Sequence, residues 1–450
     1  MVETATAQRL PVRFAGEGSG VEDLTWGQWA AWGSMQISGE ADWAGGTMPL
    51  TDGQTVEEIT RLLAFIMSRH QSLRTRLRLD ADGTPRQELS ASGEVHLEVV
   101  DAGGRDPAEV AEEVRERYET APFDVEHDWP VRMAVVCRDG VAAHFVAIYS
   151  HLAIDGYGIA ALAADLANFD RATGRHLTPV AALQPFELVR QQRSRAALRQ
   201  QAMSLRHWER HLRTVTPHRF RPVAVRSEPR YWEASYRSPA LFLALDVVAG
   251  RAKVHSGAVL LAAYAIMLSR MSGDPRSVVR TLVSNRFRPG FQESVAGVAQ
   301  SALCVVDTAG ADFDEVVARA WKSQLSAGMH AYYDPRELWA LIDRVAAERG
   351  AEFDLTCYFN DRRRSLSQSS DRVTVTSVEL SSALRESRLR WGRKSNTPDV
   401  TCFLHVNPVP DTIDLTLRVD TDYVSPDDLA NCLRGIEELV VGAAWPDRLA

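Results

Sequence analysis

Cysteine is scarce in this sequence. The five cysteines among 450 residues are odd in number, lie far apart and include no CxxC pair. This spacing supplies neither the paired framework of a disulfide-rich domain nor the ligand pairs of a structural zinc site. We expect reduced thiols, mostly in the core, at Cys137, Cys304, Cys357, Cys402 and Cys432.

Long apolar runs are also missing. The longest, VLLAAYAIML from Val259, is much shorter than the roughly 18 residues that a membrane-spanning helix needs. The first residues, MVETATAQRLPVRF, contain no apolar stretch of the kind found in a signal peptide. These two absences predict a cytoplasmic protein without a membrane partner.

An excess of positive charge is the third absence. A net charge of -8 provides no overall attraction for phosphates, so we do not expect a nucleic-acid partner. The content of 45% hydrophobic and 24% charged residues is typical of a globular protein. Because single cores rarely grow beyond about 250 to 300 residues, the length predicts two lobes, which we place at residues 1–180 and 181–450.

Apolar periodicity predicts helices mixed with strands in both lobes, which is an α/β (α+β) fold class. In the first lobe, Thr25 precedes a stripe of tryptophans at helical spacing and is a candidate helix cap. We expect helices at 26–35, 55–77, 106–123, 157–174, 184–212, 257–271 and 312–333 and near the C-terminus, and strands at 95–101, 129–139, 141–152, 241–248, 280–285 and 301–307.

The stretch VAIYSHLAIDGYGIAAL, residues 146–162, contains the candidate catalytic residues. His151 stands at the end of a predicted buried strand, and histidine is the usual general base near neutral pH. Asp155 would organise the connection by pairing with an arginine rather than by touching substrate. Gly156, at the start of the next helix, would permit a positive φ or a close backbone approach.

Several motifs in order resemble the condensation-domain family of nonribosomal peptide synthesis, which belongs to the chloramphenicol-acetyltransferase-like acyltransferases with an HxxxD motif. LTWGQWAAW resembles the opening helix motif of the family, RHQSLRTRL its RHExLRTxF, APFDVEHDWPVRMAVV its PFDL segment, and SHLAIDG its HHxxxDG. HWERHL and VAGVAQSALCVVD resemble later family segments. The resemblance extends over nearly the whole chain.

This resemblance implies a V-shaped pair of acetyltransferase-like lobes with His151 midway along a central tunnel. The second lobe would carry a floor loop and a latch, for which the predicted hairpin at residues 403–420 is the candidate. The alternative for that hairpin is a simple edge hairpin.

The resemblance also implies a free-standing transferase of natural-product biosynthesis. It would move an acyl or aminoacyl group from the phosphopantetheine thioester of a carrier protein to an amine or alcohol, forming an amide or an ester. The donor would come in trans because the chain has no GGxS carrier-type serine, and coenzyme A remains an alternative donor. We expect a monomer with no metal and no permanently bound cofactor.

Three positions depart from the family pattern, and one pairing leaves a choice. Ser150 replaces the first histidine of the family pair, while His151 occupies the place of the mechanistic one. Gln300 and Ser301 stand where the family often has Asn and Thr, and they are candidates for an acceptor-side pocket. Arg74 is the first candidate to pair with Asp155, and Arg286 is the alternative.

Two other functions stay open. The altered Ser150 and the unusual Gln300 segment fit a non-catalytic relative that binds carriers or recruits a partner enzyme. A hydrolase or metal site built on Ser150, His151 and Asp155 is weaker. Adjacent residues on a strand point to opposite faces, and the spacing offers no third metal ligand.

Overall fold

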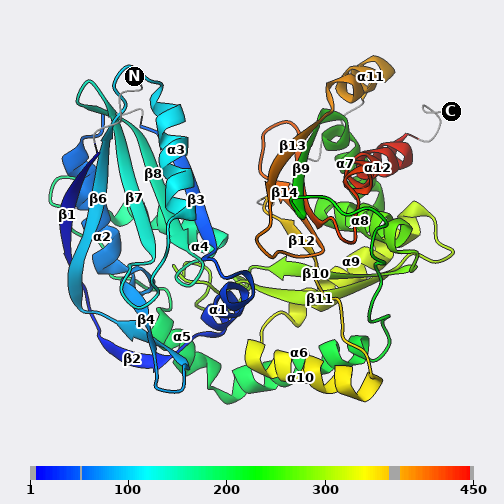
Figure 1. The fold of residues 1–450 in the computed structure, drawn as a ribbon, viewed down its shortest axis with the longest axis horizontal. Coiled ribbons are helices and arrows are strands. Elements are labelled where there is room, and N and C mark those ends of the chain that lie inside the picture. Colours follow the sequence, from blue (N-terminus) through cyan, green and yellow to red (C-terminus); the bar gives the residue numbers. More distant parts are fainter. Residues whose placement is uncertain (1–6, 51–52, 364–374, 446–450) are drawn as a thin grey trace. The chain divides into compact units, whose positions relative to one another are not determined.

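The chain divides into two compact units in the computed structural model, which describes residues 7–50, 53–363 and 375–445 (Figure 1). The first unit comprises Met1–Arg199 together with the excursion Ser284–Gln300. The second comprises Gln200–Val283 and Ser301–Ala450. The sequence-based division at residues 180 and 181 contains no such excursion and stays a prediction for the functional domains.

A five-stranded sheet forms the centre of the first unit, with the strand order β1-β6-β7-β8-β3. Only β6 and β7 run parallel, and the other neighbours are antiparallel. The strands are β1 (Ala7–Ala15), β3 (Trp43–Pro49), β6 (Ser92–Asp101), β7 (Val131–Arg138) and β8 (Val141–Ser150).

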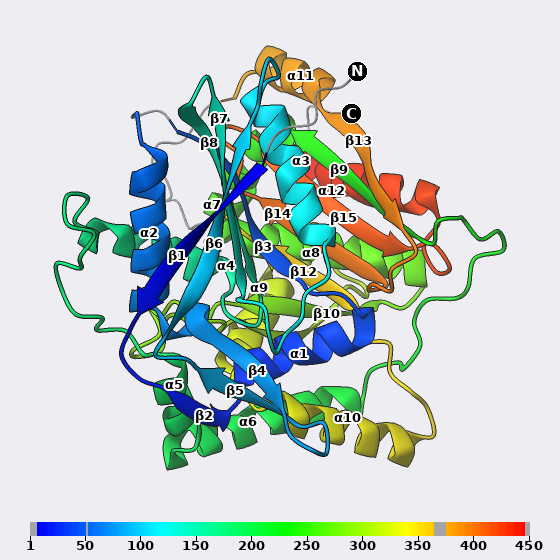
Figure 2. The same cartoon turned by 60° about the vertical axis from the view of Figure 1, so that its left-hand side comes forward.

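Helices cover both faces of this sheet, which explains why β7 and β8 are apolar on both sides (Figure 2). α3 (Pro107–Thr120) packs on one face against Val136 and Ile148. α2 (Val56–Arg69) packs on the other face, against β1 and β6. Alternate side chains along each strand therefore pack into two separate cores, one on each face of the sheet.

The rest of the first unit joins a small sheet to further helices. The strand order of this sheet is β2-β5-β4, and all of its pairs are antiparallel. The predicted cap of α1 is confirmed, because the Thr25 side chain accepts from the backbone N–H of Gln28 in a capping box. The elements are β2 (Gly20–Asp23), α1 (Trp26–Ser38), β4 (Thr75–Leu79), β5 (Pro85–Leu89), α4 (Gly156–Asp165), α5 (Pro185–Gln192) and the short 3-10 helices Gln71–Arg74 and Leu166–Asn168.

A seven-stranded sheet organises the second unit, with the order β11-β10-β12-β14-β15-β9-β13. Its strands are β9 (Tyr231–Ser238), β10 (Arg276–Val283), β11 (Gln300–Asp307), β12 (Cys357–Asp361), β13 (Arg388–Ser395), β14 (Cys402–Asn407) and β15 (Ile413–Asp420). Its helices are α7 (Pro239–Ala252), α8 (Ser256–Ser272), α9 (Phe313–Met329), α10 (Pro335–Arg349), α11 (Ser377–Glu386) and α12 (Pro426–Ala444), while α6 (Arg195–Leu212) crosses the boundary between the units.

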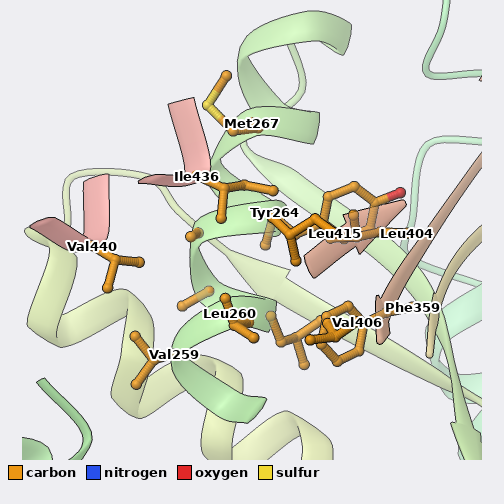
Figure 3. Packing of buried hydrophobic residues seen from close by; sticks show 14 of the residues in the cluster. Val259, Leu260, Tyr264, Met267, Phe359, Leu404, Val406, Leu415, Ile436 and Val440 are labelled. Carbon is orange, nitrogen blue, oxygen red and sulfur yellow. The ribbon is translucent and has the colours of Figure 1, made fainter. Parts of the chain in front are cut away.

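The largest core lies between this sheet and its helices. α8 is buried nearly all round and contacts α7, α9 and α12. Figure 3 shows Leu260 and Tyr264 of α8 close to Phe359 and Leu404 of the sheet. The five cysteines are all free and buried, as expected.

The hairpin expected at residues 403–420 forms from β14 and β15. The alternative of an edge hairpin is wrong, because β14 also pairs with β12 and β15 also pairs with β9. Both strands are therefore internal to the sheet of the second unit. The role of latch stays a prediction.

Four predicted elements differ from the structure. The helix expected at 55–77 ends at Arg69, and residues 75–77 belong to β4. The helix expected at 184–212 is divided into α5 and α6. Residues 241–248 are not a strand but part of α7, where Ser238 caps the helix and Leu241, Ala244, Leu245 and Val248 form one buried helical face. The helix expected at 157–174 ends at Asp165. Beyond it, the side chain of Asp170 accepts from the backbone of Ala172 and so competes with helical hydrogen bonding.

Within the described part of the chain, no single helix has the length and apolar character to cross a bilayer. One bent pair, α7 with α8, passes that test by length and composition, with an angle of 104° between its two helices.

Candidate active site

His151 follows directly on the last residue of β8, where the sequence predicts it. The chain then turns through four residues before α4 begins at Gly156. β8 pairs with β7 on one side and with β3 on the other, so a strand held on both edges presents the histidine. Its side chain is 32% exposed, so the ring is open to solvent.

One hydrogen bond sets the tautomer of the neutral His151 ring. Nδ1 lies 3.0 Å from the carbonyl oxygen of Ile154. A carbonyl only accepts, so Nδ1 carries the proton of the neutral ring and Nε2 carries the lone pair. This is the tautomer that a general base requires at Nε2.

Asp155 is a structural organiser of this connection. It is 8% exposed and caps α4, with Oδ1 accepting from the backbone N–H of Gly158 at 2.7 Å. Its Oδ2 accepts from the backbone N–H groups of Val298 and Ala299, both at 2.8 Å. The carboxylate thereby ties the turn after β8 to the excursion, which agrees with the interpretation that Asp155 orders its loop.

The arginine that pairs with Asp155 is Arg286. Its Nη2 donates to Asp155 Oδ1 at 2.7 Å, and the two side chains are 10% and 12% exposed. Nη1 of Arg286 donates to the carbonyl oxygens of Phe291 and Ser294, and Nη2 also donates to that of Ala296. This one guanidinium therefore holds together the whole excursion and joins it to the loop.

The first choice for this pairing, Arg74, is wrong. Arg74 is 1% exposed and donates to the backbone carbonyls of Glu17, Gly18 and Ser90. Burial lowers the pKa of Arg74. Its donors are engaged by the loop before β2 and the turn after β5, so it supports the small sheet rather than Asp155.

The neighbours of Arg74 in the RHQSLRTRL motif are also structural. The Arg69 guanidinium donates to Asp165 at the end of α4, at 2.5 and 2.9 Å, and His70 Nε2 lies 3.0 Å from Asp165 Oδ2. Burial by itself would raise the pKa of Asp165, but the contacts with His70 and Arg69 lower it. For His70, burial outweighs Asp165 and lowers the pKa. The motif thus anchors the far end of the helix that Asp155 caps.

Ser150 points into the protein and is fully buried. Its Oγ accepts from the backbone N–H of Leu152 at 3.3 Å. This geometry supports the turn and matches the expectation that Ser150 and His151 do not form a nucleophile and base pair.

The glycine that the site requires is Gly158 rather than Gly156. Gly156 has no positive φ, and a Cβ there would meet no atom within 4 Å. A Cβ on Gly158 would lie 2.6 Å from Ile154 Cγ1 and 2.9 Å from the carbonyl oxygen of Ala296. The reason expected for Gly156, a close backbone approach, therefore applies two residues later, where α4 meets the excursion.

The two candidate residues of the acceptor-side pocket fall in different units. Gln300 ends the excursion and is 3% exposed, whereas Ser301 belongs to the second unit and is 8% exposed. Ser301 Oγ accepts from Nε and Nη2 of Arg280 at 3.0 and 2.7 Å. A role of these residues in acceptor binding stays a prediction.

Two contributors to this site are absent from the sequence-based predictions. Asp42 lies across from His151, and the backbone N–H groups at Val298 and Ala299 hold Asp155. The glycine that marks the second contributor is Gly27 of α1, because a Cβ on Gly27 would lie 1.9 Å from the carbonyl oxygen of Gly297. Such contact between backbones is possible only for glycine. The described residues contain no cluster of three metal-ligating side chains.

Comparison with known proteins decides the family. The family model of the condensation domain matches residues 47–385. The chain belongs to the condensation-domain family. Condensation domains of nonribosomal peptide synthesis are acyl-transferring, amide-forming enzymes in general, and work with carrier proteins.

Curated relatives of this condensation domain are large synthetases. The nonribosomal peptide synthetase kk1B of Curvularia clavata is 25% identical over 352 residues, which are 73% of this chain and 3% of the relative. The isonitrile lipopeptide synthase of Mycobacterium tuberculosis is 27% identical over 318 residues, which are 65% of this chain and 12% of the relative. The chain thus spans a small fraction of the relatives it matches.

Solved structures confirm the fold class, because condensation domains have the two-lobed chloramphenicol-acetyltransferase-like fold. The X-domain from teicoplanin biosynthesis gives a TM-score of 0.71 at 18% identity, covering 96% of each chain. SgcC5 from Streptomyces globisporus gives 0.70 at 20% identity, covering 94% of this chain and 98% of that one. At these identities the likeness concerns the fold alone.

Proposed function

We propose that this condensation domain is an acyltransferase and that His151 is its general base. It takes an acyl or aminoacyl group from the phosphopantetheine thioester of a carrier protein and forms an amide or an ester. The observation that carries this proposal is the exposed ring of His151, whose Nδ1 faces the carbonyl oxygen of Ile154, so that the neutral ring has its lone pair on Nε2.

The mechanism follows from that ring. The acceptor nucleophile attacks the thioester carbonyl carbon while its proton passes to Nε2 of His151. The C–S bond then breaks, and the thiolate leaves and takes the proton as a thiol. Ile154 and the Asp155–Arg286 pair keep the ring and its loop in position, which saves the cost of reorganising them during the reaction.

Transfer from synthetic donors tests this function. Acyl thioesters of pantetheine, with acetyl, hexanoyl, benzoyl, glycyl and phenylalanyl groups, are offered with amine and alcohol acceptors, and the products are measured by mass spectrometry. His151→Ala is expected to lower kcat by about 10²- to 10⁴-fold. His96→Ala is the matched control, since His96 is an exposed histidine on β6 of the same unit. Undiminished turnover by His151→Ala rules out the role of the ring.

A second candidate is a non-catalytic domain that binds carriers or recruits a partner enzyme. Ser150 in place of the first histidine of the family pair favours it, and so does the likeness to the X-domain, one structure of which is a complex with OxyB. Binding of a carrier protein without release of coupled product from any donor would support this function over catalysis.

A further inference from the structure

The backbone places a carboxylate opposite the candidate base. The β3–β8 ladder ends at the pair of Trp43 and Ser150, and Asp42 and His151 are the residues directly beyond that pair. The backbone N–H of His151 donates to the carbonyl oxygen of Asp42 at 2.9 Å. Side chains at directly opposed positions of an antiparallel pair project to the same side. Asp42 is thus positioned by strand register.

Asp42 Oδ2 lies 3.7 Å from Nε2 of His151. This distance is too long for a hydrogen bond, and the neutral ring has no proton on Nε2 to donate, because Nδ1 holds it against Ile154. Two acceptors therefore face each other. Among the residues that the structure describes, no arginine or lysine forms an ion pair with Asp42, whose side chain is 67% exposed. The pair can accept donors from a ligand.

We propose that Asp42 is a specificity-determining residue, which together with His151 selects an amine over a hydroxyl as the acceptor. A primary amine has two N–H groups, one for the ring and one for the carboxylate, and the carboxylate also attracts its ammonium form. A hydroxyl has one proton and satisfies only one of the two acceptors. The other acceptor would then face an oxygen lone pair, which is unfavourable.

This inference rests on the proposed function and adds to it the residue that selects the acceptor. The bound ammonium gives its first proton to solvent, and Asp42 retains one N–H of the free amine. The amine nitrogen then forms the C–N bond, its second proton passes to Nε2 of His151, and the C–S bond breaks. The thiolate takes the proton from the ring, which yields an amide and a thiol.

A matched pair of acceptors tests the proposal. 2-Phenylethylamine and 2-phenylethanol share one carbon skeleton and are compared with the best pantetheine thioester donor. The wild type is expected to have the higher kcat/KM with the amine. Asp42→Ala is expected to lower kcat/KM by about 10- to 100-fold for the amine and by less than about 3-fold for the alcohol. Asp42→Asn keeps one acceptor oxygen, so its kcat/KM for the amine should lie between those of the wild type and Asp42→Ala. Asp42→Glu should retain part of the preference for the amine.

The control is Glu116→Gln, which removes an exposed carboxylate from α3 of the same unit and should leave the amine-to-alcohol ratio unchanged. A wild type that prefers the alcohol, or an Asp42→Ala variant that loses both activities equally, overturns the proposal while transferase function stands. If the wild type makes no product with either acceptor, the proposed function fails instead. Calorimetric titration with 2-phenylethylammonium then decides the amine site, because equal affinity of wild type and Asp42→Ala overturns it.

Discussion

Arg286 and Asp155 are 131 positions apart in sequence and are joined by a bond of 2.7 Å between Nη2 and Oδ1. Both side chains are largely buried. A buried carboxylate is stable only when it is paired and hydrogen-bonded, and Asp155 obtains its other partners from the backbone of the same excursion. The pair therefore decides whether residues 284–300 stay docked on the loop that carries His151.

A double-mutant cycle distinguishes Arg286 from Arg74 as the partner of Asp155. Asp155→Asn and Arg286→Met should each lower the free energy of unfolding by about 3–5 kcal/mol, and together they should cost less than the sum, with a coupling energy of about 1–3 kcal/mol. Arg74→Met should be additive with Asp155→Asn to within about 0.5 kcal/mol, because the two residues share no partner. Denaturant unfolding monitored by tryptophan fluorescence measures both cycles. Coupling of Asp155 with Arg74 alone would contradict the assignment.

The two glycines of the SHLAIDGYG stretch are expected to respond in opposite ways. Gly158→Ala inserts a methyl group against Ile154 and the carbonyl of Ala296, and such overpacking costs about 1–3 kcal/mol. Gly156→Ala meets no atom and replaces glycine where its freedom is not used, so stability should be unchanged or rise by up to about 1 kcal/mol. Thermal unfolding of the two variants checks this, and an equal loss of stability in both would contradict the geometry.

Ser150 is expected to be dispensable for chemistry. Ser150→Ala removes one hydrogen bond to the backbone N–H of Leu152, which should cost about 0.5–1.5 kcal/mol of stability. Transfer rates should stay within about 2-fold of the wild type, because the hydroxyl is buried on the side of the strand away from the ring. Progress curves of Ser150→Ala and His151→Ala, measured side by side, test this. A loss of rate as large as that of His151→Ala would indicate that the Ser150 hydroxyl takes part in the reaction.

Local patterns predicted those parts of the molecule that depend on local contacts. The cap at Thr25 and the sequence of strand, turn and helix around His151 follow from neighbouring residues, and both could be read directly. The run at 241–248 could not, because a short apolar segment suits a buried strand as well as a buried helix. In the structure, Ser238 caps this segment as helix α7. A serine at that position was the available signal for a helix.

Long-range contacts could not be predicted from the sequence. The sequence favoured Arg74 over Arg286 as the partner of Asp155, and only the docking of the excursion selects Arg286. Asp42 gave no signal at all, because its place opposite His151 depends on the pairing of strands that are about a hundred residues apart in sequence. Register of this kind is fixed by packing on the faces of the sheet rather than by a motif.

The buried ring of His207 is expected to make the second unit sensitive to acid. Nε2 of His207 donates to the carbonyl oxygen of Leu303 at 2.9 Å, and Nη2 of Arg210 donates to its Nδ1 at 3.2 Å, so the ring is held neutral. Burial, together with the neighbouring His211 and His330, lowers the pKa of His207 to about 4. A pKa below the unfolded value of about 6.5 means that the unfolded chain binds more protons. The resulting stability is therefore complete above pH 6.5 and is lost as pH falls towards 4.

Replacing His207 by glutamine should flatten this dependence. The amide nitrogen of His207→Gln can still donate to the carbonyl of Leu303, but it does not titrate. The wild type should lose on the order of 3 kcal/mol more than His207→Gln between pH 6.5 and 4, in urea unfolding at a series of pH values. A smaller slope should remain in the variant, because burial also lowers the pKa of His70 and that of His405, the latter to about 2. Identical slopes for wild type and variant would mean that the ring of His207 already takes up its proton in the folded state at pH 6.5, and that the contact with Arg210 does not hold it neutral.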